Sequence, residues 1–266
     1  MPLTYLSHQA PVVGLKILRP RWFDGTALVL GSMCPDLAYA FAGTALAFNA
    51  HTPVGLVCFC LPVTVLLWFG VRRRVAPVAF AQLPDTPLRL HDYRALSLRR
   101  PPLALTAISA LIGAVTHALW DTFTHDGRWG ARHVAILREE VATIDGTSLS
   151  VARALQYLGH VGGAIITLAL LAYIAERRLV RQWYGAAFDN LPPVVLSSRS
   201  RLLFWGVVGV GFVAGSCWAL LSGGGFATQV IKWSLGVAAG VTIASLFPAT
   251  QPSGRSGRMP AFRGFR

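Results

Sequence analysis

Residues 52–74 read TPVGLVCFCLPVTVLLWFGVRRR, and this stretch decides the fold class. No charged side chain occurs between residues 52 and 71, and three arginines follow directly. An α-helix needs about 20 apolar residues to cross the hydrocarbon core of a bilayer. The stretch therefore predicts a membrane-spanning helix with a basic loop at its end.

The rest of the chain repeats this pattern. Hydrophobic residues make up 54% of the sequence and charged residues only 13%, against about 25% charged in ordinary globular proteins. Glycines in the fourth apolar stretch, such as Gly206 and Gly211, would allow neighbouring helices to pack closely. We predict an all-α, polytopic membrane protein with five spans, near 52–71, 102–120, 151–174, 202–222 and 227–247.

The charge is strongly basic, with 24 Lys and Arg against 11 Asp and Glu and a formal net charge of +13. Nucleic-acid-binding proteins gather such cations along a groove or a helix face. Here they lie between the apolar stretches, as in Arg72–Arg74, where loops would face anionic lipid. The pattern predicts membrane lipids as partners and excludes nucleic acid.

The distribution of arginine predicts the orientation of the spans. Seven arginines lie in 72–101, five in 175–201 and four after 248, whereas 121–150 has three arginines and five acidic residues. By the positive-inside rule, the arginine-rich segments and the C-terminus are cytoplasmic. We predict a multi-pass protein of the plasma (inner) membrane, with the span ends near residues 51 and 121 on the outer side.

Other parts of the chain do not follow the pattern of the five spans. Residues 26–47 are apolar but interrupted, so we predict two short helices meeting near Cys34-Pro35-Asp36, either crossing the membrane or re-entering it. Residues 252–266 combine Arg, Gly, Ser and Pro and predict a disordered basic tail. The predicted division is a site-bearing domain (1–175), a two-helix hairpin (176–251) and the tail.

The polar residues with the most chemical content lie at the end of the second span. On a helix, residues at i, i+4 and i+8 lie roughly on one face, so His117, Asp121 and His125 would form one stripe. Imidazole and carboxylate groups are the ligands of zinc and similar divalent ions. A hydrogen-bonded His–Asp pair at the interface is the alternative interpretation.

Three more residues favour a shared site on the outer side. Asp36 lies in an apolar run, where an unpaired carboxylate is costly, and His51 immediately precedes the first span. His8 begins a short amphipathic stretch, although the cations that follow it favour a cytoplasmic N-terminus. His8 can therefore join only if residues 1–50 form a re-entrant or interfacial unit. The predicted metal ligands are His8, Asp36, His51, His117, Asp121 and His125.

Three histidines and a glutamine have other predicted roles. His160 follows Gln156 by one helical turn, so the two share a face and are expected to form helix–helix hydrogen bonds or support the site. His91 is predicted on the cytoplasmic side, and His133 in an exposed outer loop.

These motifs resemble a bacterial membrane-protein family, domain of unknown function 4184, over about residues 1–165. They are also similar to those of predicted membrane-bound metal-dependent hydrolases, in which a Pro-Asp, a later His and a Gly-x-x-x-His pattern recur. His117 and Asp121 match the His-x-x-x-Asp helix of zinc-dependent phospholipase C, whose N-terminal amine and larger histidine set have no match here. The resemblance is carried by Met1–Thr4 with His8, Leu30–Asp36, His51-Thr52, Leu61-Pro62, Gly113 and Thr116–His125.

The sequence therefore predicts a membrane-embedded, metal-dependent hydrolase at the outer interface. A bound divalent ion, zinc by ligand preference, would activate water against a lipid or lipid-linked phosphoester. The alternative is a protein without enzymatic activity, such as a metal or small-solute transporter or a structural subunit. A transporter is expected to carry polar groups near the bilayer midplane, whereas here they gather toward one end of the spans.

Overall fold

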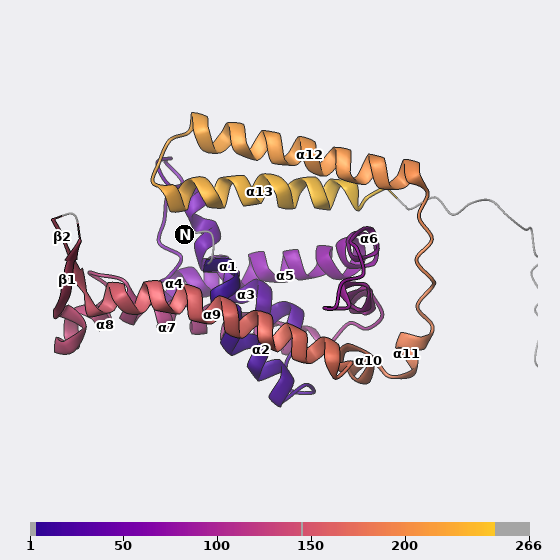
Figure 1. Ribbon diagram of the computed structural model, residues 1–266, viewed down its shortest axis with the longest axis horizontal. Coiled ribbons are helices and arrows are strands. Elements are labelled where there is room, and N and C mark those ends of the chain that lie inside the picture. The colour runs from indigo at the N-terminus through magenta and orange to yellow at the C-terminus, as the bar shows by residue number, and fades with distance from the viewer. Residues whose placement is uncertain (1–3, 145, 248–266) are drawn as a thin grey trace, which may run out of the picture.

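The computed structural model describes residues 4–144 and 146–247 (Figure 1). Within these ranges the chain is helical apart from connecting segments and one antiparallel hairpin, in which β1 (Glu140–Ile144) pairs with β2 (Thr147–Ser150). The α-helices are α1 Thr4–Ser7, α2 Gln9–Leu18, α3 Gly25–Leu37, α4 Pro53–Gly55, α5 Leu61–Gly70, α6 Ala76–Gln82, α7 Leu103–Thr124, α8 Trp129–His133, α9 Val151–Glu176, α10 Leu179–Tyr184, α11 Ala186–Asp189, α12 Ser198–Leu221 and α13 Phe226–Ala244. Short segments of other helical types are η1 Ala38–Phe41, η2 Leu56–Cys60, η3 Val71–Val75, η4 Leu90–Ser97 and η5 Ala135–Arg138.

The five predicted spans are confirmed as helices long and apolar enough to cross a membrane. They correspond to the continuous helical segment Pro53–Gln82 and to α7, α9, α12 and α13. The chain is thus an all-α, multi-pass membrane protein. The predicted tail at 252–266 lies outside the described residues.

The first span contains two segments of wide, π-type turns, η2 and η3. Each lies just before a proline, Pro62 or Pro77. A proline ring inside a helix clashes with the carbonyl group four residues earlier, which here belongs to Cys58 or Arg73. Widening the preceding turn accommodates that clash and keeps the segment helical.

Residues 4–41 form a folded-back unit of short helices. α3 has only 13 residues and is roughly 20 Å long, too short for a hydrocarbon core of about 30 Å. It runs through Pro35 to Leu37 and is followed by η1. The expected meeting of two short helices near Cys34-Pro35-Asp36 is confirmed to within two residues, at Leu37 and Ala38, but Pro35 lies in the last turn of α3 and not in the first turn of the second helix.

Close packing of α3 against α7 sets the relative position of the two helices. A Cβ atom on Gly31 would lie 2.2 Å from the carbonyl oxygen of Ala110, and one on Gly113 would lie 2.3 Å from that of Leu28. Both glycines lie about one turn before a polar residue of the predicted site. The contact therefore fixes the C-terminal part of α3 beside the C-terminal half of α7.

The helices α12 and α13 form an antiparallel pair along one side of the other helices (Figure 1). Gly211 and Gly215 on α12 face Gly236 and Gly240 on α13, and a Cβ on Gly236 would lie 2.4 Å from Cα of Gly215. The expected close helix packing is confirmed at Gly211, whereas Gly206 has open space around it.

This contact gives a first prediction. Gly215→Leu is expected to lower the thermal unfolding midpoint by roughly 5 °C, because its side chain would meet the α13 backbone at Trp233 and Gly236 and overpacking costs about 1–3 kcal/mol. Gly209→Leu is the matched control, since nothing lies within 4 Å of a Cβ there. Scanning fluorimetry in detergent compares the two, and equal midpoints would contradict the packing.

Candidate metal centre

The stripe predicted on α7 is present. His117 and Asp121 are buried, and their Nε2 and Oδ2 atoms lie 3.5 Å apart. His125 caps the helix end, its side chain is 32% exposed, and its Nδ1 lies 3.5 Å from Oδ1 of Asp121. Asp121 thus uses a different oxygen toward each neighbouring histidine.

Two further residues reach this stripe from other elements. Oδ1 of Asp36, near the end of α3, lies 3.3 Å from Nε2 of His117. His51 lies just before α4, and its Nε2 is 3.5 Å from Asp36 Oδ1 and 3.3 Å from Asp121 Oδ2. One ligand atom from each of Asp36, His51, His117 and Asp121 lies within 4.8 Å of the other three, as a shared metal ion requires.

The N-terminal segment brings His8 to the same place. His8 is buried between α1 and α2, its ring stacks on that of His117 with centroids 4.0 Å apart, and its Nε2 lies 3.7 Å from Asp121 Oδ1. The segment that carries His8 packs closely against α9, since a Cβ on Gly163 would lie 2.6 Å from the carbonyl oxygen of Ser7. α2 leads away from the cluster and α3 returns to it, so the first 41 residues fold back and bring His8 and Asp36 together.

Several ligand-type atoms in the cluster lack ordinary hydrogen bonds. Among the described residues, His51 Nε2, both ring nitrogens of His117 and Asp121 Oδ1 are buried without a hydrogen-bond partner. The nearby carboxylate oxygens lie at suitable distances for ion pairs, but their directions do not suit hydrogen bonds. Buried polar atoms normally have partners, so these atoms are available to bind a shared ligand such as a metal ion.

Burial and neighbouring charges shift the pKa values of His8 and Asp36, the two site residues at the N-terminal end of the chain. Burial, and next the neighbouring His117, lowers the pKa of His8 to about 3. Burial would raise the pKa of Asp36, but the charge of His117 and the close approach of the His117 and His51 rings to its carboxylate outweigh burial and lower that pKa. Neutral imidazole and ionised carboxylate are the forms that bind metal.

Residues that the sequence did not single out lie beside the cluster. Tyr39 follows Asp36 by three residues, its ring lies 5.9 Å from that of His51, and its hydroxyl accepts a hydrogen bond of 3.4 Å from Arg128. Arg128 in turn follows His125 by three residues. Tyr39 and Arg128 each lie three positions after a predicted ligand, and this spacing is the sequence signal that could have indicated them.

Of the other polar residues considered in the sequence, Gln156 and His160 lie near the cluster, whereas His91 and His133 lie outside it. Gln156 supports the site directly, since its amide nitrogen lies 2.8 Å from Nε2 of His125. His160 is buried against Ser7, with its Nδ1 3.4 Å from the hydroxyl oxygen. His91 and His133 contact nearby backbone carbonyl oxygens outside the cluster.

Comparison with known protein families shows which family the chain belongs to. The model of a family described as "Domain of unknown function (DUF4184)" matches residues 1–250. The chain belongs to this family. The match extends beyond the 1–165 region on which the resemblance rested and includes both helices of the C-terminal pair. No curated protein and no solved structure matches the chain, so its similarity to metal-dependent hydrolases stays a prediction.

Proposed function

We propose that this protein is a membrane-embedded, metal-dependent hydrolase that holds a divalent ion, most simply zinc, between Asp36, His51, His117 and Asp121. One observation carries the proposal. Four nitrogen–oxygen pairs among these residues lie 3.3–3.5 Å apart. Two ligand atoms bound to one tetrahedral zinc ion at 2.0–2.2 Å lie about 3.4 Å apart. These four pairs therefore have the spacing of zinc ligands, and the other two pairs lie within 4.8 Å.

The surroundings of the cluster favour a substrate at the membrane surface. The cluster lies at the ends of the spans, beyond which the chain forms α8 and the β1–β2 hairpin (Figure 1). Leu119, Trp120 and Trp129 are exposed near it, and exposed aromatic side chains are typical of the headgroup region. We therefore propose a lipid or lipid-linked phosphoester as substrate. The arginine distribution supports an outward-facing site in the plasma membrane, with a cytoplasmic C-terminus.

The chemistry assigns separate roles to the residues of the site. A divalent ion would lower the pKa of bound water and polarise a phosphoryl oxygen. His125 is the most exposed histidine of the cluster and contacts Asp121, so it is placed to accept or donate a proton at the reacting atoms. Arg128 lies three residues further and can bind a phosphoryl oxygen by charge-assisted hydrogen bonds.

The first test is the metal content of the purified, full-length protein. Wild type in detergent is expected to contain about one equivalent of zinc, and His51→Ala and His117→Ala should each reduce it to background, because three remaining ligands bind far more weakly. His133→Ala is the matched control, since that histidine lies outside the cluster. Inductively coupled plasma mass spectrometry provides the measurement.

Activity is tested with the same samples. Hydrolysis of a fluorogenic phosphodiester or a phospholipid should stop on treatment with a chelator and return with added zinc. If the protein contains the metal but hydrolyses no phosphoester, the cluster is a metal-binding site and the proposed hydrolase activity is wrong. Absence of zinc or another divalent ion, even after reconstitution, would overturn the metal centre and favour a structural role for the cluster.

A further inference from the structure

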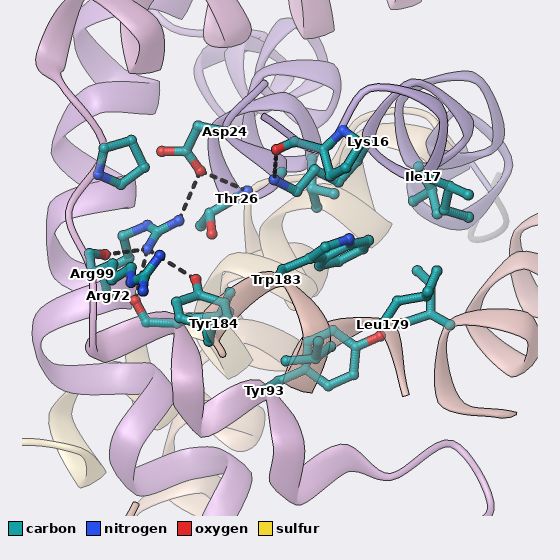
Figure 2. A pocket seen from close by; sticks show the side chains of 18 of the residues that line it. Lys16, Ile17, Asp24, Thr26, Arg72, Tyr93, Arg99, Leu179, Trp183 and Tyr184 are labelled. Carbon is teal, nitrogen blue, oxygen red and sulfur yellow. Dashed lines mark hydrogen bonds and ion pairs between the residues drawn. The ribbon is translucent and has the colours of Figure 1, made fainter. Parts of the chain in front are cut away.

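A second group of charged side chains lies away from the metal centre, beside the C-terminal end of α9 and the segment that precedes α7. It borders a pocket of about 900 Å³, shown in Figure 2. The walls come from α2, the start of α3, η3, η4 and α10. None of the six clustered histidines and aspartates lines it, so this pocket is separate from the metal centre.

The pocket carries an excess of positive charge. Its charged lining residues are Lys16, Arg21, Arg72 and Arg99 against Asp24 alone. Asp24 is already neutralised, because Arg72 Nη2 donates to its Oδ1 at 2.9 Å. Within the described ranges, the other three cations have no acidic side chain within ion-pair distance.

The three remaining cations can each contribute to an anion site. Lys16 donates to the carbonyl oxygens of Pro20 and Phe23 at 2.6 and 2.9 Å, which leaves one of its three ammonium hydrogens. Arg21 and Arg99 are exposed at the rim of the pocket. The pocket therefore offers three cations that have no acidic partner to an anion that enters it.

Beside the buried Arg72–Asp24 pair, much of the remaining wall is apolar. Ile17, Tyr93, Leu179 and Trp183 project into the region beside Lys16 (Figure 2). The volume is within the range of small-molecule sites and far larger than a phosphate ion needs. Cations at the rim with apolar walls behind them match a molecule that has an anionic head and a hydrocarbon tail.

We propose that this pocket binds an anionic phospholipid of the surrounding leaflet, with its phosphate against Lys16, Arg21 and Arg99 and an acyl chain beside Trp183. The position supports a lipid, since Arg99 lies four residues before α7 and the pocket also reaches Ile174 near the end of α9. Basic pockets between membrane helices commonly bind anionic lipid headgroups. The proposal does not depend on the metal centre.

Fluorescence quenching tests this directly in the full-length protein. Phosphatidylglycerol with brominated acyl chains, titrated into the delipidated protein in detergent, is expected to give a saturable component of quenching. Trp183→Phe should remove that component, whereas brominated phosphatidylcholine should not produce it. The difference between wild type and Trp183→Phe isolates this tryptophan from the other seven.

Charge variants complete the test. Arg21→Ala and Arg99→Ala are each expected to weaken phosphatidylglycerol binding about fivefold, and the double variant about 25-fold. Arg100→Ala is the matched control, because Arg100 is the exposed chain neighbour of Arg99 and does not line the pocket. Unchanged thermal midpoints would establish that the variants are folded.

Three results would overturn the proposal. Quenching of Trp183 by brominated phosphatidylcholine as strong as that by brominated phosphatidylglycerol would indicate general lipid contact. Arg100→Ala could weaken binding as much as Arg99→Ala, which would indicate a diffuse surface charge effect. Competition by a short-chain, water-soluble organic anion that binds more tightly than the phospholipid would assign the pocket to a soluble ligand.

Discussion

Replacing Asp121 with alanine is expected to weaken zinc binding by a factor of about 100 or more and to reduce hydrolysis to background. Its carboxylate is the centre of the cluster: Oδ2 faces His51 and His117, and Oδ1 faces His8 and His125. Structural zinc sites bind with about 10–16 kcal/mol over four ligands. One ligand is therefore worth roughly 3 kcal/mol, or about a hundredfold in affinity. Competition with a chelating dye measures the loss.

Two controls separate charge from position. Asp121→Asn keeps the size of the side chain and one acceptor oxygen, so it should bind zinc more weakly than wild type but more tightly than Asp121→Ala. Asp126→Asn changes an exposed aspartate that contacts Ser150 and Arg153 instead of the cluster, and should bind zinc like wild type. Wild-type affinity in Asp121→Ala would refute the proposed ligand set.

The candidate site could be predicted from sequence to the extent that its residues follow helical spacing or flank apolar segments. His117, Asp121 and His125 lie one turn apart on α7, and the structure places them together. The route by which His8 arrives could not be predicted, because it depends on glycine contacts between elements far apart in the chain. Gly163 against Ser7 brings in the N-terminus, and no local pattern indicates which helix a glycine will meet.

The fold was predictable in its spans because a hydrocarbon core imposes length and hydropathy on each of them. The number of arginines in each loop was less informative about whether an individual arginine is exposed or buried. Arg72 was interpreted as part of a basic loop, but it lies in the helical segment and is 5% exposed. Its partner Asp24 lies 48 positions earlier, just before α3. A loop count treats all arginines alike, whereas only tertiary packing shows which of them is buried with a carboxylate.

This buried pair gives the second large expected effect. Arg72→Leu is expected to destabilise the protein by about 3–5 kcal/mol, because it leaves the Asp24 carboxylate buried without its cation. The same guanidinium donates to the carbonyl oxygens of Leu96 and Arg99 and to the hydroxyl of Tyr184, so these acceptors also lose their donor. A fall of about 10 °C in the unfolding midpoint is expected by scanning fluorimetry.

Two variants distinguish loss of the ion pair from loss of a large side chain. Arg73→Leu removes the neighbouring, exposed arginine, which lies over Phe69, and should leave the midpoint nearly unchanged. Combining Arg72→Leu with Asp24→Asn should recover part of the stability, because asparagine removes the unpaired charge but keeps an oxygen for Trp68 and Thr106. If the double variant instead loses the sum of both single effects, the two side chains act independently, and the coupling assigned to this pair is wrong.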